Sequence, residues 1–330
     1  MGLRDVVHAW SLMLAGREAE IPPMLSSCED PMAKVGVDPS FISRHALEEQ
    51  RLTGLWLFLW GIRFIIDMLW LGKMETRTIF LPRRTVRSLH REATGCLAAR
   101  YEADTTSTDK RMPFLSEGDV LAAWMTCKAS SVLPQSSTRT VGVYSAFDLR
   151  GRLVSTFPMK KGQGAYVQNA VFPFTTNIQA RDVIARPDAL GFVAHAIRRS
   201  LTTLTTEPQI HAFARLARAS LEETQLPPLF GDTSSFLITC SNWTKTGIFE
   251  SFDLGPAVLP QASTSACRAA STLKGRPVYY HVQGVSPNNM LARNTVFLIG
   301  MPNGDYWLNA CFSPKVWREI EADFSMLSQQ

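Results

Sequence analysis

The chain has 330 residues, of which 45% are hydrophobic and 19% charged, and its formal net charge is +5. This composition excludes a disordered protein, which would have low hydrophobicity and high net charge. The basic residues are scattered in ones and twos, without the dense basic patch of a nucleic-acid-binding protein, so no nucleic acid partner is expected. The length suits one large domain or two medium ones, and we favour two.

The cysteines indicate a reducing environment. They lie far apart, with no Cys-x-x-Cys pair and no nearby pair of histidines, which predicts neither a zinc site nor a disulfide framework. We expect buried free thiols and no bound metal. The N-terminus has no charged segment followed by an apolar one, so no secretory signal is visible and a cytoplasmic protein is expected. The six cysteines are Cys28, Cys96, Cys127, Cys240, Cys267 and Cys311.

Two helices are predicted in the first quarter of the chain. Residues 5–15 form an amphipathic pattern that ends at Gly16, a glycine C-cap. Residues 55–71 are almost wholly apolar and just long enough to cross a membrane. Arg63 and Asp67 argue against a span, since each would cost about 2.5–3.5 kcal/mol at the bilayer centre. We expect a mostly buried helix, or one lying over a domain seam, and no membrane partner; a membrane anchor is the alternative.

The next segments suggest a domain boundary. Residues 76–81 alternate and are rich in β-branched side chains, which predicts a strand, and Pro82 then opens a helix to about Glu92. Residues 103–111 are polar and lack an apolar anchor, as is typical of a linker. Ser116 and Asp119 form a capping box before a helix over 120–129. We therefore divide the chain into 1–102, a linker at 103–115, and 116–330.

The rest of the chain mixes strands and helices. Without a strict βαβ order, this mixture indicates an α/β or α+β protein whose mixed sheets are flanked by helices. The predicted strands are 140–147, 166–174, 236–239, 277–282, 295–299 and 306–310, and the predicted helices are 190–202, 209–221 and 314–326.

Several short motifs follow one another in an order that points to a family. They are Ala9-Trp10-Ser11-Leu12, Glu75 to Pro82, Leu115 to Trp124, Phe147 to Arg152, Gly164 to Val171, and Ser241 to Lys245 followed by Phe252 to Val258. Together they resemble the fungal branch of the BAHD acyl-CoA-dependent acyltransferases, which includes enzymes similar to trichothecene 3-O-acetyltransferase. The resemblance implies a two-domain fold of the chloramphenicol-acetyltransferase type, with its active site in a channel between the halves and the N-terminal domain incomplete in this chain.

The resemblance also implies a reaction. Members move an acyl group, most often acetyl, from acetyl-CoA to a hydroxyl of a fungal secondary metabolite such as a terpenoid, meroterpenoid or polyketide. The expected partners are thus the acyl-CoA co-substrate and a small-molecule alcohol, with the protein a monomer. An alcohol is a poor nucleophile at neutral pH, so a positioned base contributes about 10²–10⁴-fold. In this family the base is the histidine of a His-x-x-x-Asp motif.

That motif is absent from the printed sequence. None of the histidines has aspartate at the fourth following position, and His45 with Glu49 is the nearest imitation, in surroundings that do not match the family. We assign no catalytic residue and expect the motif to lie upstream of Met1, through the choice of start codon or a real truncation. The chain should then be poorly active, and the alternative is an inactive remnant that only binds CoA or a partner. The six histidines are His8, His45, His90, His195, His211 and His281.

Four residues are candidates for the substrate and CoA channel: Trp243, Asn169, Arg150 and Lys245. Trp243 either lines the channel or fills the core, because large aromatic side chains mostly serve burial. Arg150 and Lys245 suit phosphate oxygens, with solvated surface charge as the alternative for each.

A turn follows these candidates in the sequence. Asp253 and Gly255 match the family's turn motif, in which the resemblance implies a structural role for the acid, paired with an arginine away from the chemistry.

Overall fold

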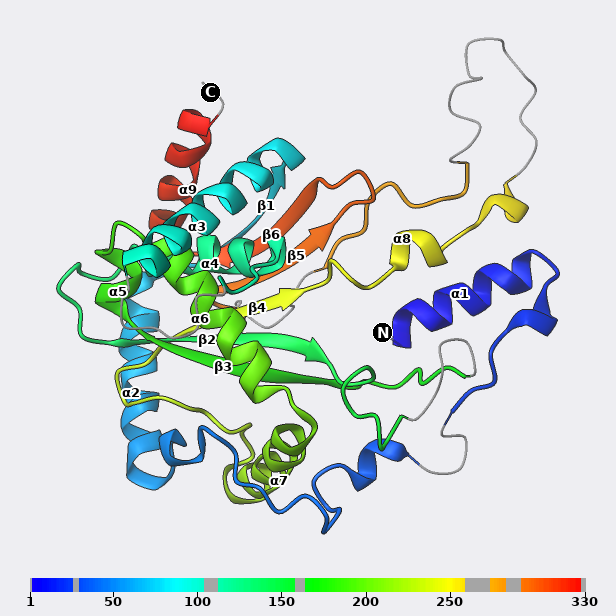
Figure 1. Ribbon diagram of the computed structural model, residues 1–330, viewed down its shortest axis with the longest axis horizontal. Coiled ribbons are helices and arrows are strands. Elements are labelled where there is room, and N and C mark those ends of the chain that lie inside the picture. Colours follow the sequence, from blue (N-terminus) through cyan, green and yellow to red (C-terminus); the bar gives the residue numbers. More distant parts are fainter. Residues whose placement is uncertain are drawn as a thin grey trace.

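The computed structural model describes residues 2–25, 30–103, 112–157, 164–258, 274–282 and 292–327. Its centre is a six-stranded mixed sheet in the order β1-β6-β5-β4-β2-β3 (Figure 1). β2, β4 and β5 are parallel to one another, and β3, β6 and β1 pair antiparallel with their neighbours. The predicted α/β class with a mixed sheet is confirmed. The strands are β1 (Glu75–Leu81), β2 (Thr140–Asp148), β3 (Val171–Gln179), β4 (Phe236–Asn242), β5 (Thr295–Gly300) and β6 (Tyr306–Phe312).

The helices fall into three groups (Figure 1). One group covers a face of the sheet: α3 (Arg83–Ala103), α4 (Glu117–Ser130), α6 (Ala189–Leu204) and α9 (Pro314–Leu327). A second lies beside and below the strands: α2 (Gly54–Leu71), the short α5 (Ala180–Ile184) and α7 (Glu207–Thr224). The third, α1 (Gly2–Leu14) with α8 (Ile248–Ser251), lies beyond the far ends of the strands. Short 3₁₀ turns occur at Glu18–Glu20, Pro31–Lys34, Glu48–Gln50 and Gly255–Ala257.

α4 is the central helix of the core. Most of its residues are buried, because it lies between the sheet and the neighbouring helices and has no solvent-facing side. The predicted capping box at its start is confirmed: Ser116 Oγ accepts the Asp119 N–H at 3.2 Å, and the Asp119 carboxylate accepts the Ser116 N–H at 2.7 Å. Arg198 of α6 also contacts Asp119, with its Nε 2.8 Å from the carboxylate. Capping and ion pairing therefore fix α4 against α6.

The strand from the predicted N-terminal domain lies in the same sheet as the others. β1 pairs with β6 along its whole length, with Ile79 opposite Leu308. α3, which follows β1, packs on α6. The segments 1–102 and 116–330 therefore share one sheet and one core, and the proposed division into domains with a linker at 103–115 stays a prediction.

Two predicted strands are wrong in extent or kind. β3 begins at Val171, not Tyr166, because the preceding residues form a loop whose carbonyls are bound by Arg150. Residues 277–282 form no strand; Tyr279 and Tyr280 are held instead by ring contacts with Trp307 and Phe249. The helix after Pro82 also continues beyond Glu92, to Ala103.

The apolar helix α2 is exposed, contrary to our expectation of a mostly buried helix. It is long and apolar enough to cross a membrane, by length and composition only. Its one buried residue is Asp67, which meets the guanidinium of Arg139, and Arg139 in turn donates to the carbonyl of Ser234 at 2.7 Å. This pair fixes one side of α2 to the body. The exposed large side chains are Leu55, Trp56, Phe58, Leu59, Ile62, Ile65, Ile66, Leu69 and Trp70.

Candidate functional site

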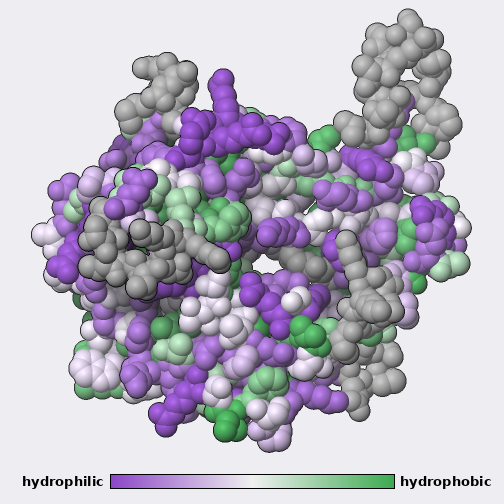
Figure 2. Space-filling model, in the orientation of Figure 1, coloured by the Kyte–Doolittle hydropathy of each residue, from purple (hydrophilic) through white to green (hydrophobic). Residues whose placement is uncertain are grey.

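The loops that carry the predicted site residues meet at one edge of the sheet. β2, β4 and β5 are parallel, so their carboxyl ends share this edge, where ligands commonly bind in α/β sheets. Arg150 follows β2, and Trp243 and Lys245 follow β4. Asn169 precedes β3, which is antiparallel to β2, and so lies at the same edge. In Figure 2 the surface has an opening between the sheet-bearing body and the part with α1 and α8.

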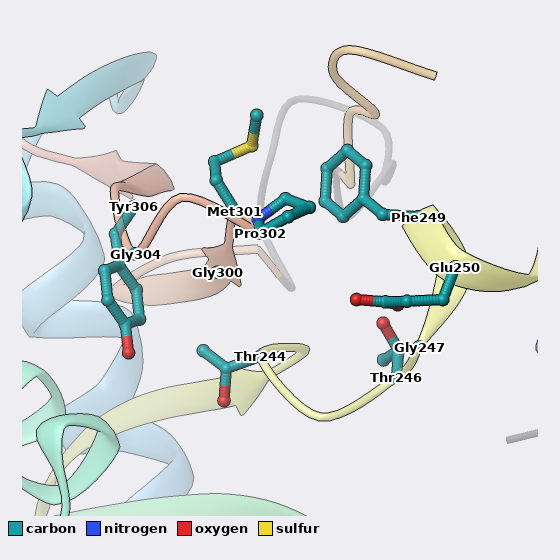
Figure 3. A pocket seen from close by; sticks show the side chains of 10 residues that line it. All are labelled: Thr244, Thr246, Gly247, Phe249, Glu250, Gly300, Met301, Pro302, Gly304 and Tyr306. Carbon is teal, nitrogen blue, oxygen red and sulfur yellow. The ribbon is translucent and has the colours of Figure 1, made fainter. Parts of the chain in front are cut away.

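A cavity of about 120 Å³ lies at this edge, between the loop after β4 and the turn that joins β5 to β6 (Figure 3). Thr244 lies at its base, Thr246 and Glu250 come from one side, and Met301 and Tyr306 from the other. The lining combines hydroxyl groups, one carboxylate and exposed backbone of a glycine-rich turn. Such a surface offers hydrogen bonds to a polar ligand.

The loop after β4 is held by its own side chains. Asn242 Oδ1 accepts the Thr244 N–H at 2.9 Å and the Thr244 hydroxyl at 2.6 Å. The Thr246 hydroxyl donates to the carbonyl of Trp243 at 2.9 Å. Gly247 then takes a positive φ of 66°, which lets α8 start at once. The threonine hydroxyls at the cavity are therefore ordered before any ligand arrives.

Gly118 lets α4 approach this loop. A Cβ on Gly118 would lie 2.3 Å from Nδ2 of Asn242, closer than any real contact allows. The sequence motif at the start of α4 and the Asn-Trp motif at the end of β4 are thus packed together, and a larger residue at position 118 would have to displace the Asn242 amide.

Tyr306 forms a wall of the cavity and is tied to α4. Its hydroxyl donates to Glu117 Oε2 at 2.6 Å. Burial, and then the hydrogen bond and charge of Glu117, raise the pKa of Tyr306 above its ordinary value. The phenol therefore stays protonated in the neutral pH range and acts as a donor that positions Glu117.

The first helix packs on α8 and on the turn that follows it. Ser11 Oγ accepts the Asp253 N–H at 2.9 Å, and the rings of Trp10 and Phe252 meet edge to face with centroids 6.0 Å apart. A Cβ on Gly2 would lie 2.0 Å from the carbonyl oxygen of Val167, so the start of α1 touches the loop before β3. Two motifs that lie far apart in the sequence meet here.

The predicted channel residues have different surroundings. Trp243 is half-buried beside the cavity without lining it, and its indole N–H donates to Ser241 Oγ at 2.9 Å. Lys245 and Asn169 are exposed. Arg150 donates to the carbonyls of Tyr166 and Gln168 at 3.0 and 2.6 Å and lies over the Tyr166 ring, so it orders the loop before β3. Channel roles for these four residues stay predictions.

Asp253 forms the contacts of a turn residue. Its carboxylate accepts the Gly255 N–H at 2.8 Å and lies 3.3 Å from Arg276. Both charged side chains of this pair are partly exposed.

The described histidines lie outside the cavity. His45 is buried against the rings of Phe230 and Phe213. His211 is stacked on Phe41, and its Nδ1 accepts the Gly36 N–H at 3.1 Å. Within the described ranges, no three His, Cys, Asp or Glu side chains are grouped to hold a metal ion.

Sequence reasoning missed the residues that line the cavity. Thr244 lies within the Ser241 to Lys245 motif, which by itself gives it no role. Thr246 and Glu250 lie just after that motif, and Tyr306 belongs to a predicted strand. One signal was available: small and hydroxyl residues directly after a parallel strand, at the edge where such sheets bind ligands.

No family model matches the chain, but curated proteins resemble it over nearly its whole length. The acetyltransferase pyiB of Pyricularia grisea is 33% identical over 97% of this chain and 60% of its own length. The acetyltransferase sphE of Aspergillus fumigatus is 31% identical over 99% of this chain and 62% of its own length. The acetyltransferase adrJ of Penicillium rubens is 31% identical over 97% of this chain and 62% of its own length. The chain spans less than two thirds of these relatives.

Solved structures share the fold. TRI101 of F. graminearum, complexed with coenzyme A and deoxynivalenol, matches with a TM-score of 0.61 at 13% identity, over 97% of this chain and 62% of that one. TRI101 of F. sporotrichioides, complexed with coenzyme A and T-2, matches with a TM-score of 0.60 at 15% identity, over 98% and 62%. The chain thus shares the α/β fold of the TRI101 structures. Over nearly its whole length the chain is thus similar to fungal acetyltransferases, in keeping with the resemblance that its motifs indicate.

Proposed function

We propose that the chain takes part in O-acyl transfer, with acetyl-CoA as donor and a hydroxyl of a bulky fungal secondary metabolite, such as a terpenoid, meroterpenoid or polyketide, as acceptor. The observation that carries this proposal is the similarity, over nearly the whole chain, to fungal acetyltransferases. The polar cavity at the carboxyl edge of β4 and β5 supports it, since its fixed hydroxyl oxygens can accept a hydrogen bond from an acceptor alcohol.

Transfer needs the alcohol proton to leave as its oxygen attacks the thioester carbon. The bond from the acyl carbon to sulfur then breaks, and CoA leaves as the thiol. Within the described residues the cavity contains no imidazole, and a positioned base is worth about 10²–10⁴-fold. We therefore expect the 330-residue chain to bind CoA and to transfer acetyl groups slowly.

The test is acetyl transfer with and without added imidazole. The chain is incubated with acetyl-CoA and a panel of polycyclic alcohols, among them deoxynivalenol, and free thiol and acetylated product are measured against a protein-free reaction. Slow, alcohol-dependent transfer that imidazole accelerates supports the proposal. CoA binding without any transfer would favour the binding-only alternative. If the chain neither bound CoA nor transferred an acetyl group, the proposed function would be refuted.

A further inference from the structure

An exposed row of arginines begins at the lip of the cavity. Arg83, Arg84, Arg87 and Arg91 stand on the first half of α3 and are all exposed. With 3.6 residues per turn, they fall within an arc of about 100° on one face of the helix. We call these four residues the α3 arginine row. Figure 2 shows hydrophilic side chains gathered over the start of α3.

The first member of the row touches the cavity wall. Leu81, at the end of β1, pairs with Tyr306, so α3 starts at the same edge as the cavity. A Cβ on Gly304 would lie 2.8 Å from Cδ and 2.9 Å from Nε of Arg83, and Gly304 lines the cavity. The stem of Arg83 therefore rests on the turn between β5 and β6, with its guanidinium at the rim.

The charges of the row are not neutralised by the described part of the chain. None of the four guanidinium groups forms an ion pair there. Asp305, which contacts this segment, accepts the backbone N–H of Arg83 at 2.7 Å and the side-chain amide of Asn303 at 2.6 Å. Like charges one turn apart destabilise a helix, so the spacing of Arg83, Arg87 and Arg91 is unfavourable without an anion.

The size of the cavity indicates which part of a ligand would reach the row. A volume of about 120 Å³ is too small for a nucleotide, since the pockets that hold drug-sized ligands measure about 300–1,000 Å³. A long ligand that places a narrow arm in the cavity must leave its bulky, charged end on the rim. Coenzyme A has this form: a thin pantetheine arm joined through a diphosphate to an adenosine 3′-phosphate.

We propose that the α3 arginine row binds the phosphate groups of coenzyme A, with Arg83 and Arg87 as the main contacts. The assignment rests on the proposed function. Guanidinium groups form paired, charge-assisted hydrogen bonds with phosphate oxygens, and such bonds are stronger than neutral ones. The contribution should fall along the helix from Arg83 to Arg91, because Arg83 is the member at the cavity.

The experiment measures CoA and adenosine 3′,5′-bisphosphate binding by calorimetry for four proteins: the unchanged chain, Arg83→Ala/Arg87→Ala, Arg91→Ala and Arg181→Ala. Arg181, on α5, is a matched exposed arginine far from the cavity. We expect the double variant to weaken both ligands roughly tenfold or more, Arg91→Ala to weaken them less, and Arg181→Ala to leave them unchanged. Circular dichroism checks that each variant folds.

The outcomes separate this assignment from the proposed function. CoA affinity of the double variant equal to that of Arg181→Ala would overturn the arginine assignment and leave acyl transfer standing. Bisphosphate binding that depends on Arg83 and Arg87 in a chain that transfers no acetyl group would uphold the assignment and count against the transfer. Failure of the unchanged chain to bind either ligand would overturn both.

Discussion

Ser11 and Asp253 lie 242 residues apart in the sequence, and a hydrogen bond of 2.9 Å from the Asp253 N–H to Ser11 Oγ joins them. The same hydroxyl donates to the Val7 carbonyl at 2.8 Å. This serine thus fixes the first helix on the turn that follows α8, next to the candidate site. The contact explains why two short motifs that lie far apart in the sequence belong to one structural unit.

Ser11→Ala should therefore loosen α1. The part-buried Asp253 N–H would lose its partner, which costs about 1 kcal/mol of unfolding free energy. Urea unfolding measures the loss, and hydrogen exchange over residues 2–14 should rise. Ser43→Ala, at an exposed serine, is the matched control. Equal stability of the two variants would show that the contact does not hold the helix.

The buried ion pair between Asp67 and Arg139 predicts a double-mutant result. Asp67→Ala leaves Arg139 buried without its counter-charge, and breaking one partner of such a pair costs about 3–5 kcal/mol. The double variant Asp67→Leu/Arg139→Met should recover much of that loss. Arg17→Ala, at the exposed pair with Glu20, should lower the stability far less. A single Asp67 variant as stable as Arg17→Ala would contradict the role of the pair.

Gly118 and Gly95 should respond oppositely to alanine. Alanine usually stabilises a helix by about 1 kcal/mol relative to glycine, and a Cβ on Gly95 meets nothing within 4 Å. A Cβ on Gly118 collides with Asn242, so Gly118→Ala should cost about 1–3 kcal/mol. Thermal unfolding of both variants gives the comparison. A stabilising Gly118→Ala would mean that α4 and the loop after β4 are not in close contact.

His45 predicts an acid-sensitive stability. Burial lowers the pKa of His45 to about 4, against a smaller opposing effect of Glu48. In the unfolded chain the imidazole binds its proton near pH 6.5. The free energy of unfolding is therefore at its full value above pH 6.5. It falls by about 3 kcal/mol as the pH decreases from 6.5 towards 4.

His45→Phe keeps an aromatic ring between Phe213 and Phe230 and should flatten this dependence. Burial also lowers the pKa of His211, so the part of the pH dependence that comes from His211 would remain. Urea midpoints at pH 5 and pH 7.5 test this, with exposed His8→Gln as control. An unchanged pH slope in His45→Phe would contradict the assignment.

Local pattern predicted most of the elements, because their causes are local. Alternation and β-branched residues marked β1, and the Ser116 and Asp119 pair marked the start of α4. The exposure of α2 could not be predicted, since the same apolar run suits a buried helix, and only the position of Arg139 decides which side of α2 docks.

The cavity also could not be predicted from the sequence. It depends on the approach of the turn at Gly304 to the loop at Thr244, which is set by the register of β5 and β6. For Arg150 the sequence suggested a ligand contact, and the structure shows a contact within the protein. Its charge suited phosphate, but the carbonyls of the loop before β3 occupy its guanidinium.

Hydrogen exchange with and without coenzyme A tests the central claim most directly, because it reports both binding and location. The claim is that the ligand lies at the carboxyl edge of β4 and β5. The predicted result is slower exchange on CoA addition over residues 243–251 and 300–306, with residues 207–224 of α7 unchanged. Protection confined to α7 or to α2, with these two loops unaffected, would contradict it.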